Sequence, residues 1–264
     1  GTKESVKKYA LVSKDTAIES KVSSLLSQEP EQPIIVPFTY SDLLSDTNGE
    51  IEFNRFRSFF FSRDLFSVQS PLRKDTFFFG RTKLVQELTD RFKSGENSGL
   101  FGLRKSGKTS VIYSIQRGAQ ENSQTVISMD CESPSIHGLR WHQLLGQIVR
   151  RYHDAKQSQI KKPLAEYTDA CAADDFSRDM LAVYRSKKAA PALLVFDEIE
   201  RICSKTGSSP HWASADDFVY FWQSIRAFIQ EHPGVINFLI VGTNPQSVEL
   251  SKIGTHDNPL FALV

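Results

Sequence analysis

Apolar positions in the second two-thirds of the chain follow two alternating patterns. Short segments typical of single strands lie at residues 98–101 and 125–129, and the segments at 192–196 and 236–241 are nearly continuously apolar, as in buried strands. Runs with apolar residues three or four positions apart, as in amphipathic helices, lie at residues 84–92, 108–116, 139–152, 175–185 and 215–230. Strands with continuous apolar sequence are buried on both faces. The alternation therefore predicts an α/β fold, a parallel sheet covered by helices on both sides.

The first third of the chain lacks this alternation. Residues 1–48 are polar, with one helical stretch at 15–28 followed by several prolines, and they predict a linker or arm that is mostly irregular or helical. Residues 49–75 are dense in phenylalanine, which predicts a segment docked on the following domain, at residues 76–264. We expect Phe59, Phe60 and Phe61 to pack in part against that domain. A partner-binding surface, for protein or for single-stranded nucleic acid, is the alternative.

Composition excludes several classes of protein. With 32 Lys and Arg against 31 Asp and Glu, the total charge favours neither nucleic acid nor an anionic membrane, although a local basic face is left open. No apolar run approaches the ~20 residues of a membrane helix. The three cysteines are widely spaced, which favours the cytoplasm over a disulfide framework. The chain does not begin with Met and ends without a polar tail, so we expect a piece of a longer protein.

The strongest chemical signal is a phosphate-binding loop. The stretch Gly102-Leu103-Arg104-Lys105-Ser106-Gly107-Lys108-Thr109 matches G-x-x-x-x-G-K-[ST], between a predicted strand and a predicted helix. Backbone N–H groups of such a loop converge on phosphate oxygens at the helix N-terminus. Lys108 should reach the β and γ phosphates, and the Thr109 hydroxyl should bind Mg²⁺. The expected nucleotide-binding residues are Gly102, Arg104, Lys105, Ser106, Gly107, Lys108, Thr109 and Ser110.

Two carboxylates follow the 192–196 strand, at the end where parallel sheets bind ligands. We expect Asp197 to hold magnesium together with Thr109, and Glu198 to polarise the attacking water. Neighbouring residues of a strand point to opposite faces, so the two carboxylates should have different neighbours. The six histidines show no ligand spacing, and magnesium is the one metal expected.

The strands at 236–241 and 125–129 also end in polar residues. Thr243 or Asn244 should contact the γ-phosphate or the attacking water, and Asn244 is our catalytic candidate, with an Asn-Pro turn as the alternative. Asp130 either lines the site or ends its strand in a turn.

The order of these motifs, preceded by Phe79-Gly80-Arg81, resembles that of the AAA+ and STAND group of P-loop ATPases. It is most similar to the prokaryotic STAND-type or "archaeal ATPase" families, over roughly residues 75–260. The resemblance implies a three-layer αβα sandwich with sheet order 5-1-4-3-2, in which the 236–241 strand lies between the strands at 98–101 and 192–196. It also implies that Gly80 and Arg81 line the adenine pocket, and that a helical lid and a winged helix follow the chain.

The same resemblance implies a magnesium-dependent ATPase that acts as a regulatory switch. ATP would control oligomerisation or an attached effector, for example in bacterial antiphage defence, so the expected partners are further copies or an effector domain, with no membrane. ATP is favoured over GTP because the guanine-reading motif N-K-x-D is absent from the sequence. A DNA-associated AAA+ ATPase of the initiator or loader type is the alternative. A scaffold that binds nucleotide without turnover is disfavoured, because Lys108, Thr109, Asp197 and Glu198 are all present.

Overall fold

The computed structural model describes residues 8–29, 31–46, 48–61, 70–74, 78–158, 166–186, 190–261 and 263. They belong to two compact units, Gly1–Arg81 and Thr82–Val264. None of the helices in these described ranges combines the length and the apolar composition needed to cross a bilayer.

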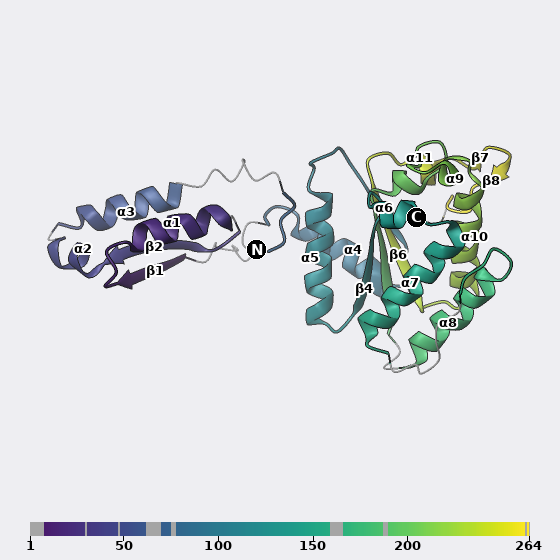
Figure 1. Cartoon of the computed structure of the whole chain (residues 1–264), viewed down its shortest axis with the longest axis horizontal. Coiled ribbons are helices and arrows are strands. Elements are labelled where there is room, and N and C mark those ends of the chain that lie inside the picture. The colour runs from purple at the N-terminus through teal and green to yellow at the C-terminus, as the bar shows by residue number, and fades with distance from the viewer. Residues whose placement is uncertain are drawn as a thin grey trace. The chain divides into compact units, whose positions relative to one another are not determined.

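The first unit is a small α/β structure. Its elements are β1 (Lys8–Ser13), α1 (Ile18–Gln28), β2 (Ile34–Thr39), α2 (Tyr40–Ser45) and α3 (Glu50–Phe61) (Figure 1). Strands β1 and β2 pair in parallel, which requires a crossover connection, and α1 provides it. A capping box starts α2: Thr39 Oγ1 accepts from the Asp42 N–H at 3.1 Å, and Asp42 Oδ2 accepts from the Thr39 N–H at 2.9 Å.

This unit corrects the expectation of an irregular polar arm over residues 1–48. Val22, Val36, Phe38 and Phe59 form its buried core, so the apolar side chains of the strand and helices cover one another. The prediction that at least one of the three phenylalanines is buried is confirmed for Phe59, but its partners belong to the same unit. Phe60 packs on the same cluster, and the side chain of Phe61 lies outside the described part of the chain.

The second unit alternates helices and strands as the apolar pattern predicts. Its elements are α4 (Thr82–Lys93), β3 (Ser98–Phe101), α5 (Lys108–Glu121), β4 (Thr125–Asp130), α6 (Pro134–His137), α7 (Trp141–Lys156), α8 (Ala172–Ser186), β5 (Ala192–Asp197), the 3-10 helix η2 (Ile199–Ile202), α9 (Pro210–Ala213), α10 (Asp216–Glu231), β6 (Ile236–Gly242), α11 (Gln246–Glu249), β7 (Lys252–Ile253) and β8 (His256–Asp257).

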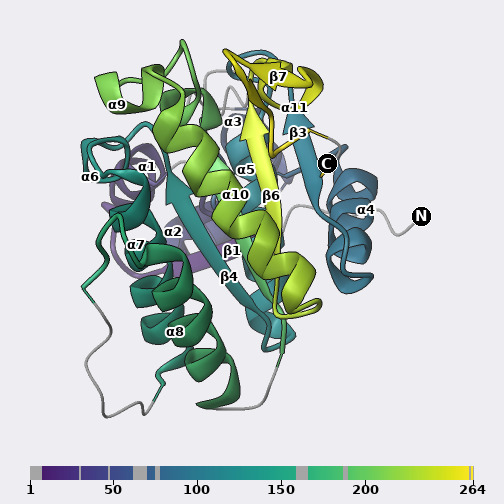
Figure 2. The ribbon, with the colours of Figure 1, turned by 90° about the vertical axis from the view of Figure 1, so that its right-hand side faces the viewer.

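A parallel four-stranded sheet in the order β3-β6-β5-β4 forms the middle layer. This order is the 1-4-3-2 part of the expected 5-1-4-3-2 sheet, and β6 lies between β3 and β5 as expected. A fifth strand of this sheet does not occur among the described residues. Helix α5 covers one face, and α7 and α10 cover the other, with α8 packed on α7 (Figure 2). The unit therefore has the three-layer αβα fold of P-loop NTPases.

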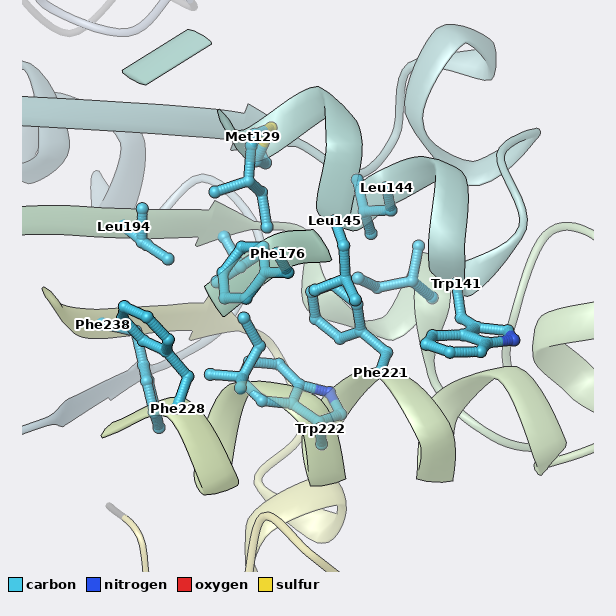
Figure 3. Close-up of a cluster of buried hydrophobic side chains, with 14 of the residues drawn as sticks. Met129, Trp141, Leu144, Leu145, Phe176, Leu194, Phe221, Trp222, Phe228 and Phe238 are labelled. Atoms are coloured by element: carbon cyan, nitrogen blue, oxygen red, sulfur yellow. The ribbon is translucent and has the colours of Figure 1, made fainter. Parts of the chain in front are cut away.

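Aromatic side chains dominate the core between the sheet and α10. Trp222 lies 5.2 Å from Phe238 (Figure 3) and 5.3 Å from Phe196, measured between ring centroids, so one helical residue contacts two strands. Phe176 of α8 and Phe228 of α10 form a further edge-to-face pair at 5.2 Å. Each such side chain stabilises the fold by about 1.5–3 kcal/mol through burial. This packing fixes the strands whose carboxyl ends carry the candidate site.

Candidate nucleotide site

The loop between β3 and α5 has the backbone that phosphate binding requires. Gly107 adopts the left-handed conformation, with φ 85°, immediately before α5, which a glycine adopts at little cost. Lys105 is also left-handed, with φ 60°. The Gly102 N–H donates to the Gly242 carbonyl at 3.1 Å, and the Ser106 N–H donates to the Leu103 carbonyl at 3.2 Å, so the loop folds back on itself and is tied to β6.

The nucleotide-binding candidates lie on this loop and on the first turn of α5. Arg104 and Lys105 are exposed on the loop, whereas Ser110 is buried on α5. The first N–H groups of a helix point out of its N-terminal end, so the first turn of α5, which begins at Lys108, directs backbone donors toward the loop. A phosphate group is the ligand that such donors accommodate.

Lys108 places its ammonium group inside the curve of the loop. The side chain is buried, and its Nζ donates to the Gly102 carbonyl at 2.9 Å and to the Leu103 carbonyl at 3.2 Å. A cation held against the loop's own carbonyls lies where phosphate oxygens would meet it.

Thr109 and Asp197 bring two distant parts of the sequence together. The Thr109 hydroxyl donates to Asp197 Oδ2 at 3.1 Å, across 88 residues of sequence. Burial raises the pKa of Asp197, and the nearby charge of Glu198 adds to the effect. A hydroxyl and a carboxylate are oxygen ligands of the type that Mg²⁺ prefers, and a cation favours the ionised form of a buried carboxyl. These two residues therefore fit a magnesium ion.

Glu198 lies beyond the end of β5. Its backbone is left-handed, with φ 53°, and it precedes η2, so the alternation of side chains along a strand does not orient it. Its side chain lines an open hollow beside the loop, together with Leu103, Arg104, Glu200, Arg201, Thr206 and Thr243. Asp197 and Glu198 have different neighbours, but not through the strand alternation that we expected to separate them, and the roles of the two carboxylates stay predictions.

The end of β6 places Thr243 and Asn244 differently. Thr243 lines the hollow with Glu198, whereas Asn244 Oδ1 accepts from the Gln246 N–H at 3.0 Å in the turn before α11. The turn that was the alternative for Asn244 is thus present. A catalytic role for Asn244 stays a prediction, and Thr243 is the residue that shares the hollow with the carboxylate.

Asp130 and the Phe79-Gly80-Arg81 segment remain as candidates. Asp130 pairs in register with Asp197, but its Oδ1 accepts from the Glu132 N–H at 3.0 Å, as in a turn that ends a strand. Gly80 and Arg81 precede α4 and belong to the first unit, so their place in an adenine pocket stays a prediction.

Sequence reasoning missed Glu200. One of its oxygens, Oε1, accepts from the Thr243 hydroxyl at 2.9 Å and from the Asn244 N–H at 2.8 Å, and it also accepts from the Thr243 N–H. Glu200 falls outside the acidic pair that ends the strand, and a second glutamate two residues after Glu198 is the one signal that could have indicated it.

The chain matches no family model and no curated protein sequence. Among solved structures it is similar to a Walker-type ATPase of Pyrococcus abyssi, with a TM-score of 0.46 and 13% identity over 74% of this chain and 54% of the other. It is also similar to the Aeropyrum pernix ORC1 protein in complex with DNA, with a TM-score of 0.40 and 12% identity over 65% of this chain and 41% of the other. The chain thus spans about half or less of those proteins.

Proposed function

We propose that the second unit binds Mg²⁺-ATP and hydrolyses its γ-phosphate. The observation that carries this proposal is the 3.1 Å contact between the Thr109 hydroxyl and Asp197 Oδ2, beside the buried Lys108 ammonium. A P-loop sequence alone indicates a phosphate site. A carboxylate from another strand, placed against its threonine, adds the second oxygen ligand that a magnesium ion needs there.

Each residue has a distinct proposed task. The backbone from Gly102 to Thr109 holds the phosphates, Lys108 neutralises charge on them, and Thr109 and Asp197 hold the metal. A bound magnesium ion would supply positive charge that stabilises the phosphate oxygens during transfer. Glu198 accepts a proton from the attacking water. Its left-handed backbone, a conformation that costs a non-glycine residue about 1–2 kcal/mol, supports a role that depends on the position of its side chain.

We further propose that hydrolysis serves a regulatory switch of the STAND or AAA+ type, which controls self-assembly or an attached effector. The order of the motifs along the chain supports this class, and antiphage defence is one setting in which such a switch would act. The balanced charges of the chain give no specific support to the alternative, a DNA-associated ATPase.

The test of hydrolysis separates binding from turnover. Glu198→Gln keeps the shape of the side chain and removes its charge, so ATP affinity should be nearly unchanged while the single-turnover rate falls ~10²-fold or more. Asp197→Ala should instead weaken Mg²⁺-ATP binding, because a metal ligand is lost. Glu121→Gln, at an exposed position at the carboxyl end of α5, is the matched control and should behave as the parent.

Two results would contradict the proposal. If Glu198→Gln hydrolyses ATP at the parent rate, Glu198 is not the base. If the parent protein binds ATP without turnover, the unit is a nucleotide-gated switch and not an enzyme. Light scattering with ATP, with and without duplex DNA, tests the regulatory part: DNA binding without self-assembly would favour the alternative.

A further inference from the structure

Glu200 connects the ends of two neighbouring strands of the sheet. It follows β5 in the helix η2. Its Oε1 accepts hydrogen bonds from the backbone N–H groups of Thr243 and Asn244, which follow β6, and from the Thr243 hydroxyl. A carboxylate oxygen that accepts several hydrogen bonds at once holds its donors in a fixed geometry. The segment after β6 is therefore held against the segment after β5.

Gly242 makes this contact sterically possible. A Cβ atom at Gly242 would lie 2.6 Å from Glu200 Oε1 and 2.9 Å from Ile199 Cγ2, closer than real Cβ contacts allow. The Gly242 carbonyl accepts from the Gly102 N–H at 3.1 Å, at the start of the phosphate loop. Gly242 thus bonds to the phosphate loop through its carbonyl, and because it has no side chain it leaves room for the Glu200 carboxylate.

Glu200 also lies between two hollows. It lines the open hollow beside the phosphate loop together with Glu198 and Thr243, and it also lines a more enclosed cavity together with Asn244 and Cys203. Among the described residues, its second oxygen, Oε2, is buried and has no hydrogen-bond partner. A buried oxygen without a partner costs free energy, so stability of the loop does not by itself explain a glutamate at position 200.

We propose that Glu200 is a positioning residue for ATP hydrolysis, which holds Thr243 in the hollow that contains Glu198. The inference rests on the proposed function of this site. The hydrogen bonds of the Glu200 carboxylate go to Thr243 and Asn244 and not to Lys108 or Thr109. Its loss should therefore affect turnover much more than nucleotide affinity.

The experiment compares Glu200→Ala with a matched structural control, Asn258→Ala. Asn258 is buried and also ties down the segment after β6, since its Nδ2 donates to the Ser247 and Leu250 carbonyls at 2.8 and 2.7 Å. Glu200→Ala should lower the single-turnover rate ~10-fold or more, the scale of a misplaced reacting group, and leave ATP affinity within about threefold, or about 0.65 kcal/mol. Asn258→Ala should lower the melting temperature with little change in turnover.

Two further measurements separate positioning from general loosening. Glu200→Gln keeps an oxygen that can accept the same hydrogen bonds, so it should restore much of the turnover that Glu200→Ala loses. In the protein without nucleotide, amide hydrogen exchange at Thr243 and Asn244 should be faster in Glu200→Ala and unchanged at Phe238, in the middle of β6.

The inference is overturned if Glu200→Ala lowers the melting temperature as Asn258→Ala does while turnover stays at the parent level. It is equally overturned if exchange at Thr243 and Asn244 is unchanged. A parent protein without turnover refutes the proposed function and, with it, a role in hydrolysis. The exchange rates would still decide whether Glu200 holds the segment, so the two failures are distinguishable.

Discussion

The role of Lys108 gives the most direct test of the nucleotide site. Its ammonium is buried and is held by two neutral carbonyls, those of Gly102 and Leu103, at 2.9 and 3.2 Å. Phosphate binding would replace these neutral acceptors with charged oxygens, and charge-assisted hydrogen bonds are roughly twice as strong as neutral ones. Loss of such a contact should cost about 2 kcal/mol. ATP affinity should then fall about 30-fold, since 1.4 kcal/mol corresponds to tenfold.

The assay is calorimetric titration with Mg²⁺-ATP. Lys108→Met is preferred to Lys108→Ala, because methionine keeps much of the buried aliphatic stem and removes only the charge. Lys83→Met, at an exposed position near the start of α4, makes the same change away from the loop and should bind ATP as the parent does. Melting curves recorded in parallel show whether each variant is folded.

A folded Lys108→Met variant with the parent affinity for ATP would refute the assignment of the loop. Weak binding that Lys83→Met shares would mean that the effect comes from the net charge of the protein and not from the loop. The expected result is a loss confined to Lys108→Met.

Three more predictions follow from particular contacts. Burial raises the pKa of Asp197, so the folded protein favours the protonated carboxyl and loses stability when Asp197 ionises. The stability contributed by the protonated form is fully present below the usual carboxyl pKa of 3.8 and is lost as pH rises through the raised value. Asp197→Asn should therefore raise the melting temperature at neutral pH, but not at pH values below that range, while it weakens Mg²⁺-ATP binding; an equal melting temperature at neutral pH would contradict this. Gly242→Ala should push Glu200 away and reduce turnover as Glu200→Ala does, at a cost of about 1–3 kcal/mol in the free energy of unfolding, measured by denaturant titration beside single-turnover kinetics; parent-level turnover would mean that the contact is dispensable. Phe59→Ala should destabilise the first unit by about 3–5 kcal/mol without changing ATP affinity, whereas Phe53→Ala, at a residue 65% exposed, should have little effect, and equal effects in thermal unfolding would contradict the observed packing.

Much of the second unit could be predicted from the sequence because its two central strands, β5 and β6, are buried on both faces. Nearly continuous apolar segments such as 192–196 and 236–241 have few alternatives to a central strand, and the order of the four strands agrees with the expected topology. The phosphate loop could be predicted for a related reason. Its glycine at position 107 and its lysine at position 108 must occupy fixed places between a strand and a helix, so the sequence pattern and the backbone are closely linked.

The first unit could not be predicted in the same way. Strand β1 contains the short apolar run Tyr9-Ala10-Leu11-Val12 but is exposed along almost its whole length, so it has neither the burial of a central strand nor an alternation with a buried face. Its pairing with β2 depends on contacts made across α1, at a distance that local patterns do not report. Phenylalanine density correctly indicated burial, but it could not indicate which surface would bury Phe59.

Within the site, the limit of prediction lies at the strand ends. The backbone of Glu198 is left-handed, and such a conformation at a residue other than glycine has no sequence signature. The choice between Thr243 and Asn244 depends on a turn: Asn244 Oδ1 bonds to the Gln246 N–H, which leaves Thr243 in the hollow. The role of Glu200 could not be predicted for the same two reasons, because its partners are known only when the ends of β5 and β6 are seen side by side.

These contacts also suggest how the state of the nucleotide could be read outside the site. The end of β6 bonds to the phosphate loop through Gly242 and to Glu200 through Thr243, and Asn244 then starts the turn into α11, beyond the carboxyl end of β6 (Figure 2). A change at the γ-phosphate that moves Thr243 must therefore either break its bonds to Glu200 or carry the following turn with it. Because packed elements shift between discrete arrangements more readily than they deform, we expect the second outcome. A regulatory switch would then act first on the segment that follows β6, and hydrogen exchange in α11 with and without Mg²⁺-ATP should detect it. Equal exchange in both states would exclude this segment as the element that responds to nucleotide.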